Sequence, residues 1–248
     1  MLSRFISKAL EHLYAYDSVR AAKDRVRPLK HLIFGKDDIY LVTDLIKAAR
    51  GAVPVKIVLD VGAAYGDKTL TFLRVFPETS VHCFEPQNAS RAHLVKRIAR
   101  WKDRVVVHEY GLFNENRTVD LRLYSYPDAS SLLPIPEYMR HEGKGEVGTE
   151  TIRLRRLDDC IAELSVPKID LLKVDVEGVE REVLEGAAHA LRVTDNVFVE
   201  IAPLRKGPHT ADHIAVFSLM HELGFTLMGH YGDYWFSKDP SVMKMFFG

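Results

Sequence analysis

The chain has 248 residues, a length that suits a single α/β domain with modest extensions. Its 34 basic side chains equal its 34 acidic ones, so charge gives no argument for nucleic acid or an anionic membrane surface as a partner. No apolar run approaches the roughly 20 residues needed to cross a bilayer. Cys83 and Cys160, the two cysteines, are too few for a disulfide scaffold and predict buried thiols in a reducing cytoplasm.

Residues 1–50 are expected to form a helical extension. In residues 1–28 the apolar side chains recur at helical spacing, and three acids argue against an organellar transit peptide. This helix is expected to dock on the core or to mediate a homodimer, with membrane-surface binding as a weaker alternative. A second helix is expected at 37–50, begun by an aspartate cap and ended by Gly51.

Residues 51–248 are expected to form one α/β domain, because short β-branched runs alternate with amphipathic stretches. This alternation is typical of a mostly parallel sheet covered on both faces, a three-layer α/β/α sandwich. The last two short runs, joined by a His-Tyr-Gly-Asp turn, predict an antiparallel C-terminal hairpin. The expected strands are 56–60, 80–84, 104–109, 169–174, 196–201, 225–229 and 234–237, and the expected helices are 68–76, 88–101, 180–191 and 211–223.

The alternation breaks between Arg117 and Leu157. Residues 118–124 and 151–154 alternate like antiparallel strands. The segment 125–150 between them holds three prolines and three glycines. A connection of that length inside a compact domain is usually functional or mobile.

The first motif that carries chemistry is the turn after the 56–60 strand, V-L-D-V-G-A-A-Y-G-D. Glycine at 62 allows the backbone to approach a ligand, and Gly66 allows the next helix to begin close to the sheet. The dinucleotide pattern G-x-G-x-x-G is not met, because Asp60 stands where it requires its first glycine. A carboxylate there would repel a pyrophosphate but can accept hydrogen bonds from an ammonium group, directly or through water. S-adenosylmethionine (SAM) carries such an ammonium, and NAD does not.

The second motif is Glu85, which ends the following strand and precedes Pro86. In doubly wound folds an acid at this place binds the two ribose hydroxyls. The alternative is a solvated acid at a helix entrance, where the helix dipole favours it. Its separation from the glycine turn favours the ligand site.

The third motif places Lys173, Asp175 and Glu177 at alternate positions at the end of a hydrophobic strand. Their side chains are therefore expected on a common side. Three charged side chains at the end of a buried strand cost folding free energy unless they form ion pairs or belong to a functional site. The alternative to a functional site is an ion pair on a half-solvated edge.

With these three motifs, residues from Ile57 to about Pro203 resemble the FkbM-type methyltransferase domain. The resemblance lies in V-L-D-V-G-A-x-x-G, F-E-P, S-S-L at 130–132, R-L-D-D and D-L-L-K-V-D-V-E-G-x-E-x-x-V-L-x-G. It implies a class I, Rossmann-like fold with a seven-stranded sheet, SAM as cofactor, and methyl transfer to a hydroxyl of a sugar, glycan or natural product. Tyr65 departs from the family's usual asparagine.

We expect one set of residues to bind the cofactor and a second to act on the acceptor. The cofactor set is Asp60, Gly62, Ala63, Tyr65, Gly66, Glu85, Pro86, Gly111, Leu112 and Asp175. Asp175 and Glu177 are the expected catalytic residues, with Lys173 orienting them or serving as base if burial lowers its pKa. Ser130 and Ser131 are expected near the carboxylate end of SAM or near the acceptor.

Two questions stay open at the sequence level. Asp175 and Glu200 could hold Mg²⁺ or another hard cation, alone or with Glu177, or the acids could bind substrate hydroxyls directly. Two other functions also compete, an NAD-linked oxidoreductase and a non-catalytic SAM-fold interaction protein. The turn at Asp60 opposes the first of these, and the charges after Leu172 oppose the second.

Overall fold

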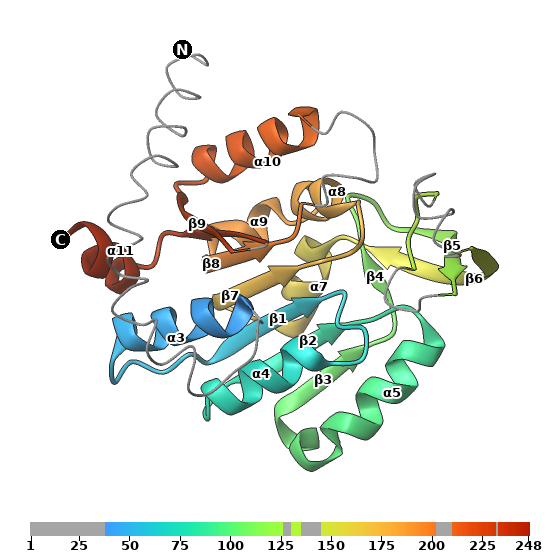
Figure 1. Cartoon of the computed structure of the whole chain (residues 1–248), viewed down its shortest axis with the longest axis horizontal. Helices are drawn as coiled ribbons and strands as arrows, with labels where there is room; N and C mark the ends of the chain where they lie inside the picture. The colour runs from blue at the N-terminus through green and yellow to red at the C-terminus, as the bar shows by residue number, and fades with distance from the viewer. Residues whose placement is uncertain (1–37, 126–129, 135–144, 202–209, 232) are drawn as a thin grey trace.

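The computed structural model describes residues 38–125, 130–134, 145–201, 210–231 and 233–248 (Figure 1). The expected helix within residues 1–28 lies outside these ranges, so its docking, dimer and membrane roles stay predictions. No helix within the described ranges is both long enough and apolar enough to cross a membrane.

The centre of the molecule is a seven-stranded sheet in the order β3-β2-β1-β7-β8-β10-β9. Strands β3, β2, β1, β7 and β8 pair in parallel, and β10 pairs antiparallel with both β8 and β9. The predicted sheet and C-terminal hairpin are confirmed, with β10 inside the sheet and β9 at its edge. The strands are β1 (Ile57–Val61), β2 (Ser80–Phe84), β3 (Val105–His108), β7 (Ile169–Val174), β8 (Thr194–Val199), β9 (Thr226–Tyr231) and β10 (Asp233–Ser237).

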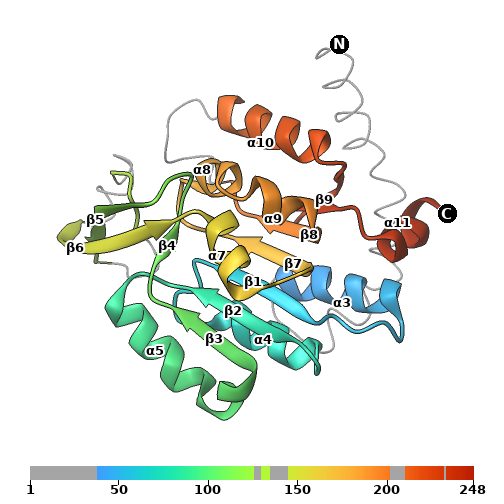
Figure 2. The same ribbon diagram turned by 180° about the vertical axis from the view of Figure 1, so that it is seen from behind.

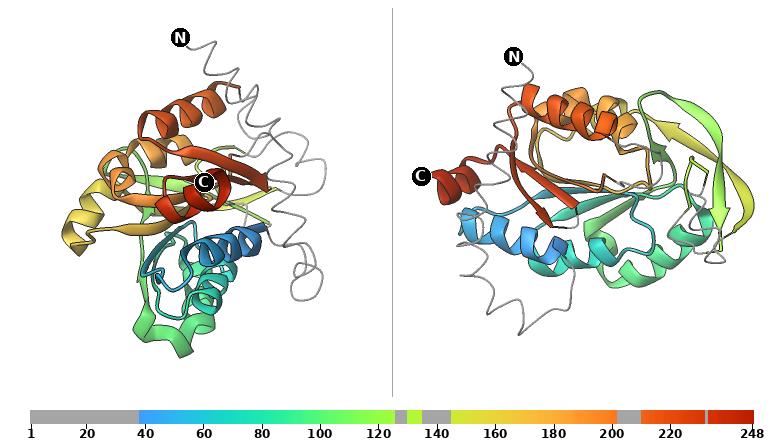
Figure 3. Two further views of the ribbon diagram at one scale, coloured as in Figure 1. Left: turned by 90° about the vertical axis from the view of Figure 1, so that its left-hand side faces the viewer. Right: turned by 45° about the horizontal axis from the view of Figure 1, so that its top comes forward.

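Helices cover both faces of this sheet, which gives three layers (Figure 3). One face buries the apolar sides of α3, α4, α5 and α11, and the other buries those of α7, α8, α9 and α10. Strands covered on both faces are mostly apolar, and β7 is buried at every position, including the charged residues Asp170 and Lys173. The helices are α3 (Asp38–Arg50), α4 (Asp67–Val75), α5 (Asn88–Ile98), α7 (Leu157–Leu164), α8 (Glu180–Glu185), α9 (Ala188–Arg192), α10 (Thr210–Glu222) and α11 (Pro240–Phe247).

Three helical details differ from the sequence prediction. The single helix expected at 180–191 is two helices that separate at Gly186, where a β-carbon would lie 2.0 Å from the Phe113 carbonyl oxygen. The end of the helix expected at 88–101 is the 3₁₀ helix Ala99–Arg104. Helices α7 and α11 were not predicted, although Asp239 caps α11 by accepting from the Ser241 amide at 2.9 Å.

A second sheet, in the order β4-β6-β5, lies at one end of the first (Figure 2). It consists of β4 (Gly111–Leu112), β5 (Arg117–Tyr124) and β6 (Glu146–Arg155). The predicted antiparallel pair is confirmed as β5 and β6, but β6 begins at Glu146, so the end of the expected long connection is strand. Leu121, Ile152 and Leu154 of this sheet bury Val179, which fixes the sheet against the segment after β7.

Helix α3 packs into the core, although it belongs to the predicted N-terminal extension. Ile39, Val42 and Ile46 are fully buried. At its end, Arg50 forms ion pairs with Asp170, Asp195 and Asp239, which join α3 to β7, β8 and α11. Gly51 follows at φ 57°, and its amide donates to the Lys47 carbonyl at 3.0 Å, so the predicted helix end is confirmed.

Candidate functional site

One pocket lies where β1, β2 and β7 end, between the main sheet and the second sheet. Strands β2 and β3 follow β1 on one side of it, and β7 and β8 lie on its other side. The strand order therefore reverses between β1 and β7, and such folds bind ligands at this switch point. Most of the predicted site residues line it: Gly62, Ala63, Tyr65, Glu85, Pro86, Gly111, Leu112, Lys173, Asp175 and Glu177. Ser130 also lines it, as does an apolar wall from Leu121, Leu132, Ile152, Leu154, Val176 and Val179.

The turn after β1 is shaped by the neighbouring strand. The Gly62 amide donates to the Phe84 carbonyl at 3.0 Å, and Gly62 has φ 73°. A β-carbon there would lie 1.8 Å from the Asp175 carbonyl oxygen. The sequence suggested that glycine is needed here for the approach of a ligand. The structure adds a second reason, because the chain after β7 passes too close to Gly62 for a side chain.

The structure shows a further reason for glycine at position 66. This residue begins α4 with φ 84°, and a β-carbon would lie 2.5 Å from the Leu94 Cδ1 atom of α5. A side chain at this position would therefore meet both the strain of positive φ and the Leu94 side chain. Gly66 does not line the pocket, and its expected contact with a cofactor stays a prediction.

Asp60 is fully buried and does not line the pocket either. Its Oδ2 atom accepts a hydrogen bond from the Thr69 hydroxyl at 2.6 Å. Its Oδ1 atom has no hydrogen-bond partner and lies 3.4 Å from the Lys173 ammonium. A direct contact of Asp60 with a bound ammonium group is therefore not indicated, whereas contact through water stays a prediction; the charge of Asp60 lies next to the pocket residue Lys173.

Lys173 connects the two strands at the switch point. Its Nζ atom lies 3.3 Å from Asp175 and donates to the Gly62 carbonyl at 2.9 Å. Burial alone would lower the pKa of Lys173, but the carboxylates of Asp175 and Asp60 outweigh burial and raise it. The lowered pKa that a role as base requires is therefore not indicated, and an orienting role fits the contacts of Lys173.

Glu85 presents a carboxylate to the pocket from the end of β2, with 6% of the residue exposed. The amides of Ala64 and Gln87 donate to its two oxygens at 2.8 and 2.9 Å. Burial raises the pKa of Glu85 to about 6, against the effect of these amides. A carboxylate has about four acceptor positions, so two remain for a ligand that donates two hydrogen bonds.

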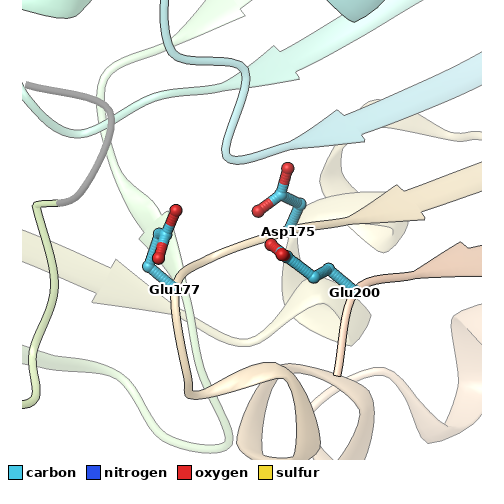
Figure 4. Close-up of side chains that lie close together, drawn as sticks. All are labelled: Asp175, Glu177 and Glu200. Atoms are coloured by element: carbon cyan, nitrogen blue, oxygen red, sulfur yellow. The ribbon is translucent and has the colours of Figure 1, made fainter. Parts of the chain in front are cut away.

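Asp175, Glu177 and Glu200 bring carboxylate oxygens within 4.8 Å of one another. Figure 4 shows Asp175 and Glu200 pointing toward each other, with Glu177 beside them on the segment after β7. Burial and the hydrogen bond shared with Asp175 raise the pKa of Glu200 to about 10. Burial would raise the pKa of Asp175, but Lys173 and the hydrogen bond from Glu200 lower it. The pair therefore combines a protonated and an ionised carboxyl group.

Glu180 is a site residue that sequence reasoning missed. It is buried, and its Oε1 atom accepts from the amides of Gly178 at 2.8 Å and Val176 at 3.2 Å. Burial raises the pKa of Glu180 to about 7. Through these two hydrogen bonds Glu180 holds the backbone between Asp175 and α8. In the sequence, the feature that could have indicated this role was an acid in the first turn of the predicted helix.

Comparison with known proteins agrees with this architecture. The family described as "Methyltransferase FkbM domain" matches residues 60–227. The chain is 28% identical over 158 residues to 2-O-methyltransferase NoeI of Sinorhizobium fredii, covering 59% of this chain and 63% of NoeI. It is 32% identical over 162 residues to 31-O-demethyl-FK506 methyltransferase FkbM of Streptomyces tacrolimicus, covering 55% of this chain and 61% of that protein.

The chain thus spans less than two thirds of the length of either relative. Among solved structures, a candidate caffeoyl-CoA O-methyltransferase from Staphylococcus aureus has a TM-score of 0.50 and 11% identity, covering 94% of this chain and 98% of that one. At that identity the likeness concerns the fold alone. The family match covers more than half of the chain. This chain therefore belongs to the FkbM family of SAM-dependent methyltransferases.

Proposed function

We propose that this protein is an O-methyltransferase that uses SAM to methylate a hydroxyl of a sugar, glycan or natural product. The observation that carries the proposal is the shared pocket, which Glu85 after β2 lines together with Asp175 and Glu177 after β7. The Glu85 carboxylate can accept hydrogen bonds from ribose hydroxyls, and the Asp175 and Glu177 carboxylates can accept them from a hydroxyl of the acceptor. The names of NoeI and FkbM, both methyltransferases acting at oxygen, support the acceptor atom.

The cofactor assignment follows the order of the lining residues. Glu85 would bind the ribose through its two remaining acceptor positions, and Pro86, Gly111 and Leu112, which line the same pocket, would hold the adenine. The turn from Gly62 to Tyr65 holds the methionine end. Lys173 keeps this turn fixed to β7, since it donates to the Gly62 carbonyl. The bound cofactor supplies a methyl group on a positively charged sulfur.

The chain itself must orient the acceptor and accept its proton. A sugar hydroxyl is a poor nucleophile, so a nearby base assists its attack. Asp175 fits this role because it lines the pocket and pairs with Lys173 at 3.3 Å. Glu177 binds a second acceptor hydroxyl, and Glu200 donates a hydrogen bond to Asp175.

The same three carboxylates support a second arrangement, in which Asp175, Glu177 and Glu200 hold a divalent cation. Their oxygens lie within 4.8 Å of one another, and Mg²⁺ binds such ligands. Turnover with and without a chelator, followed by addition of Mg²⁺, separates the two arrangements. Activity that survives chelation supports direct action by the acids.

Calorimetric titration with SAM, S-adenosylhomocysteine and NAD tests the cofactor. Micromolar binding of SAM and its demethylated product is expected, and NAD is expected not to bind. A chain that binds NAD and not SAM is an oxidoreductase candidate, and the proposal fails. The acceptor is then sought by incubating the protein and methyl-labelled SAM with neutral methyl hexosides, methyl uronosides and polyhydroxylated macrolides. Transfer to nitrogen or carbon, located by NMR, contradicts O-methylation, and binding of SAM without transfer to any of them favours a non-catalytic role.

A further inference from the structure

The segment 130–134 reaches the site from the second sheet. Ser131 forms an isolated antiparallel bridge with Arg122 of β5, through backbone hydrogen bonds of 3.0 and 3.1 Å. The Tyr124 hydroxyl holds the same segment by donating to the Leu133 carbonyl at 2.9 Å. Ser130 and Leu132 line the pocket, whereas Ser131, which lies between them, does not. The three residues therefore alternate, as in an extended strand.

Ser131 faces the segment after β7. Its hydroxyl donates to the Glu177 carbonyl at 2.7 Å and accepts from the Leu133 amide at 3.0 Å. Only 1% of Ser131 is exposed, so solvent does not compete for these bonds. The sequence placed this serine near the cofactor or the acceptor, but the structure places it against the backbone of a predicted catalytic residue.

Glu177 needs such support because its backbone is strained. It has φ 61°, in the left-handed region that residues other than glycine rarely adopt, and Gly178 follows at φ 114°. A strained conformation persists only where neighbouring contacts hold it. Glu180 fixes the Val176 and Gly178 amides on either side of Glu177, and the Ser131 hydroxyl binds the Glu177 carbonyl itself.

We propose that Ser131 is a positioning residue that holds Glu177 in its left-handed conformation and so directs the Glu177 carboxylate into the acceptor side of the pocket. The assignment rests on the proposed function only in treating Glu177 as an acceptor-binding acid. Ser131 also connects the second sheet to the segment that carries Glu177, because the pocket-lining residues Ser130 and Leu132 lie on either side of it.

The first test needs no acceptor. Hydrogen–deuterium exchange of the full chain is followed in peptides covering residues 175–180, for the wild type, Ser131→Ala and Thr151→Ala. Thr151 provides a matched control, since its hydroxyl also makes a hydrogen bond in the second sheet, to Asp120 at 2.8 Å, but it is exposed and away from the pocket. Ser131→Ala is expected to speed exchange in these peptides roughly tenfold, the usual effect of losing a buried hydrogen bond. Unchanged exchange overturns the proposal.

The second test separates positioning from general stability. With a hydroxylated acceptor found by the screen above, Ser131→Ala is expected to lower kcat roughly tenfold with the KM for SAM unchanged. In a Glu177→Gln background the same substitution is expected to have little further effect, because residues that act together are non-additive. Additive losses overturn the proposal. Failure of the proposed function would appear separately, as absent SAM binding, and would leave the exchange result intact.

Discussion

At the scale of single residues, burial of Glu85 makes its affinity for the cofactor depend on pH. The carboxylate must be ionised to accept from two ribose hydroxyls, yet burial raises its pKa to about 6. Because its folded pKa is raised, this group disfavours the folded state above pH 6, and that cost disappears as the pH falls toward the unfolded value. Affinity for the cofactor changes in the opposite direction, because protonation removes an acceptor.

We therefore expect S-adenosylhomocysteine to bind roughly tenfold more weakly at pH 5 than at pH 7, since only about a tenth of Glu85 is ionised at pH 5. Calorimetry across this range measures the effect. Glu85→Ala is expected to bind SAM roughly 30- to 150-fold more weakly at pH 7, from the loss of about 2–3 kcal/mol. Glu85→Gln serves as the control, since its affinity should not show the loss below pH 6. An equal pH dependence in that variant would assign the titration to another group.

The pair of Asp175 and Glu200 gives a second prediction at this scale. The raised pKa of Glu200 and the lowered pKa of Asp175 favour a proton on Glu200, so the amide of Glu200→Gln is expected to replace the protonated carboxyl group as hydrogen-bond donor. This variant is expected to keep turnover within a few-fold of the wild type, whereas Asp175→Asn loses roughly 10²- to 10⁴-fold, the usual effect of removing a positioned base. Both should keep most of their affinity for SAM, because in the proposed function Asp175 acts on the acceptor.

Steady-state kinetics with the acceptor from the screen provides the measurement. If Glu200→Gln instead loses as much turnover as Asp175→Asn, and added Mg²⁺ stimulates only the wild type, Glu200 acts as an ionised cation ligand. The direct role of Asp175 would then be abandoned.

At the scale of elements, the chain segments after β1 and β7 can lie close together only because Gly62 has no side chain. Gly62→Ala would place a β-carbon 1.8 Å from the Asp175 carbonyl oxygen, in addition to the strain of φ 73°. We expect a loss of about 3 kcal/mol or more in the free energy of unfolding, together with loss of SAM binding.

Gly51→Ala is the matched control for this substitution. Gly51 also has positive φ, 57°, but a β-carbon there meets nothing within 4 Å. Strain alone should therefore cost about 1–2 kcal/mol. Urea denaturation compares the two variants, and equal losses would show that the contact with Asp175 does not constrain Gly62.

At the scale of the whole molecule, the end of the sheet opposite the pocket is held by one arginine. Arg50 pairs with three carboxylates at the beginning of the strands and of α11. The Asp170 carboxylate also accepts from the Lys56 and Ile57 amides at 2.7 and 2.9 Å. Burial would lower the pKa of Arg50, but its hydrogen bonds to Asp170 and Asp239 raise it.

Arg50→Met leaves buried carboxylates without their cation, so it is expected to cost about 3–5 kcal/mol in stability. Differential scanning calorimetry should show a Tm lowered by roughly 10 °C. Lys56→Ala removes an ion pair with Glu78 in which both side chains are more than half exposed, and should cost less than about 1 kcal/mol. A loss of SAM affinity in folded Arg50→Met would contradict the separation of this cluster from the pocket.

The sequence by itself determined the class of fold and the ends of the strands that form the pocket. Apolar runs and helical periodicity are local properties, and a glycine turn after β1, an acid after β2 and charges after β7 must meet when those strands are parallel. The short elements were not determined in this way. Helices α7 and α11 and strand β4 are too short for their periodicity to be distinctive, and their packing against other elements defines them.

Only the tertiary structure decided what each site residue contacts. Spacing along the chain placed Asp60, Lys173 and Asp175 near the same end of the sheet, but the pairing of β1 with β7 puts Lys173 between the two acids and buries Asp60 beneath the turn. The same holds for Ser131 and Glu177, which lie far apart in sequence and meet through the second sheet. Contacts and pKa values depend on which strands pair and how deeply side chains are buried, and neither quantity is encoded in local pattern.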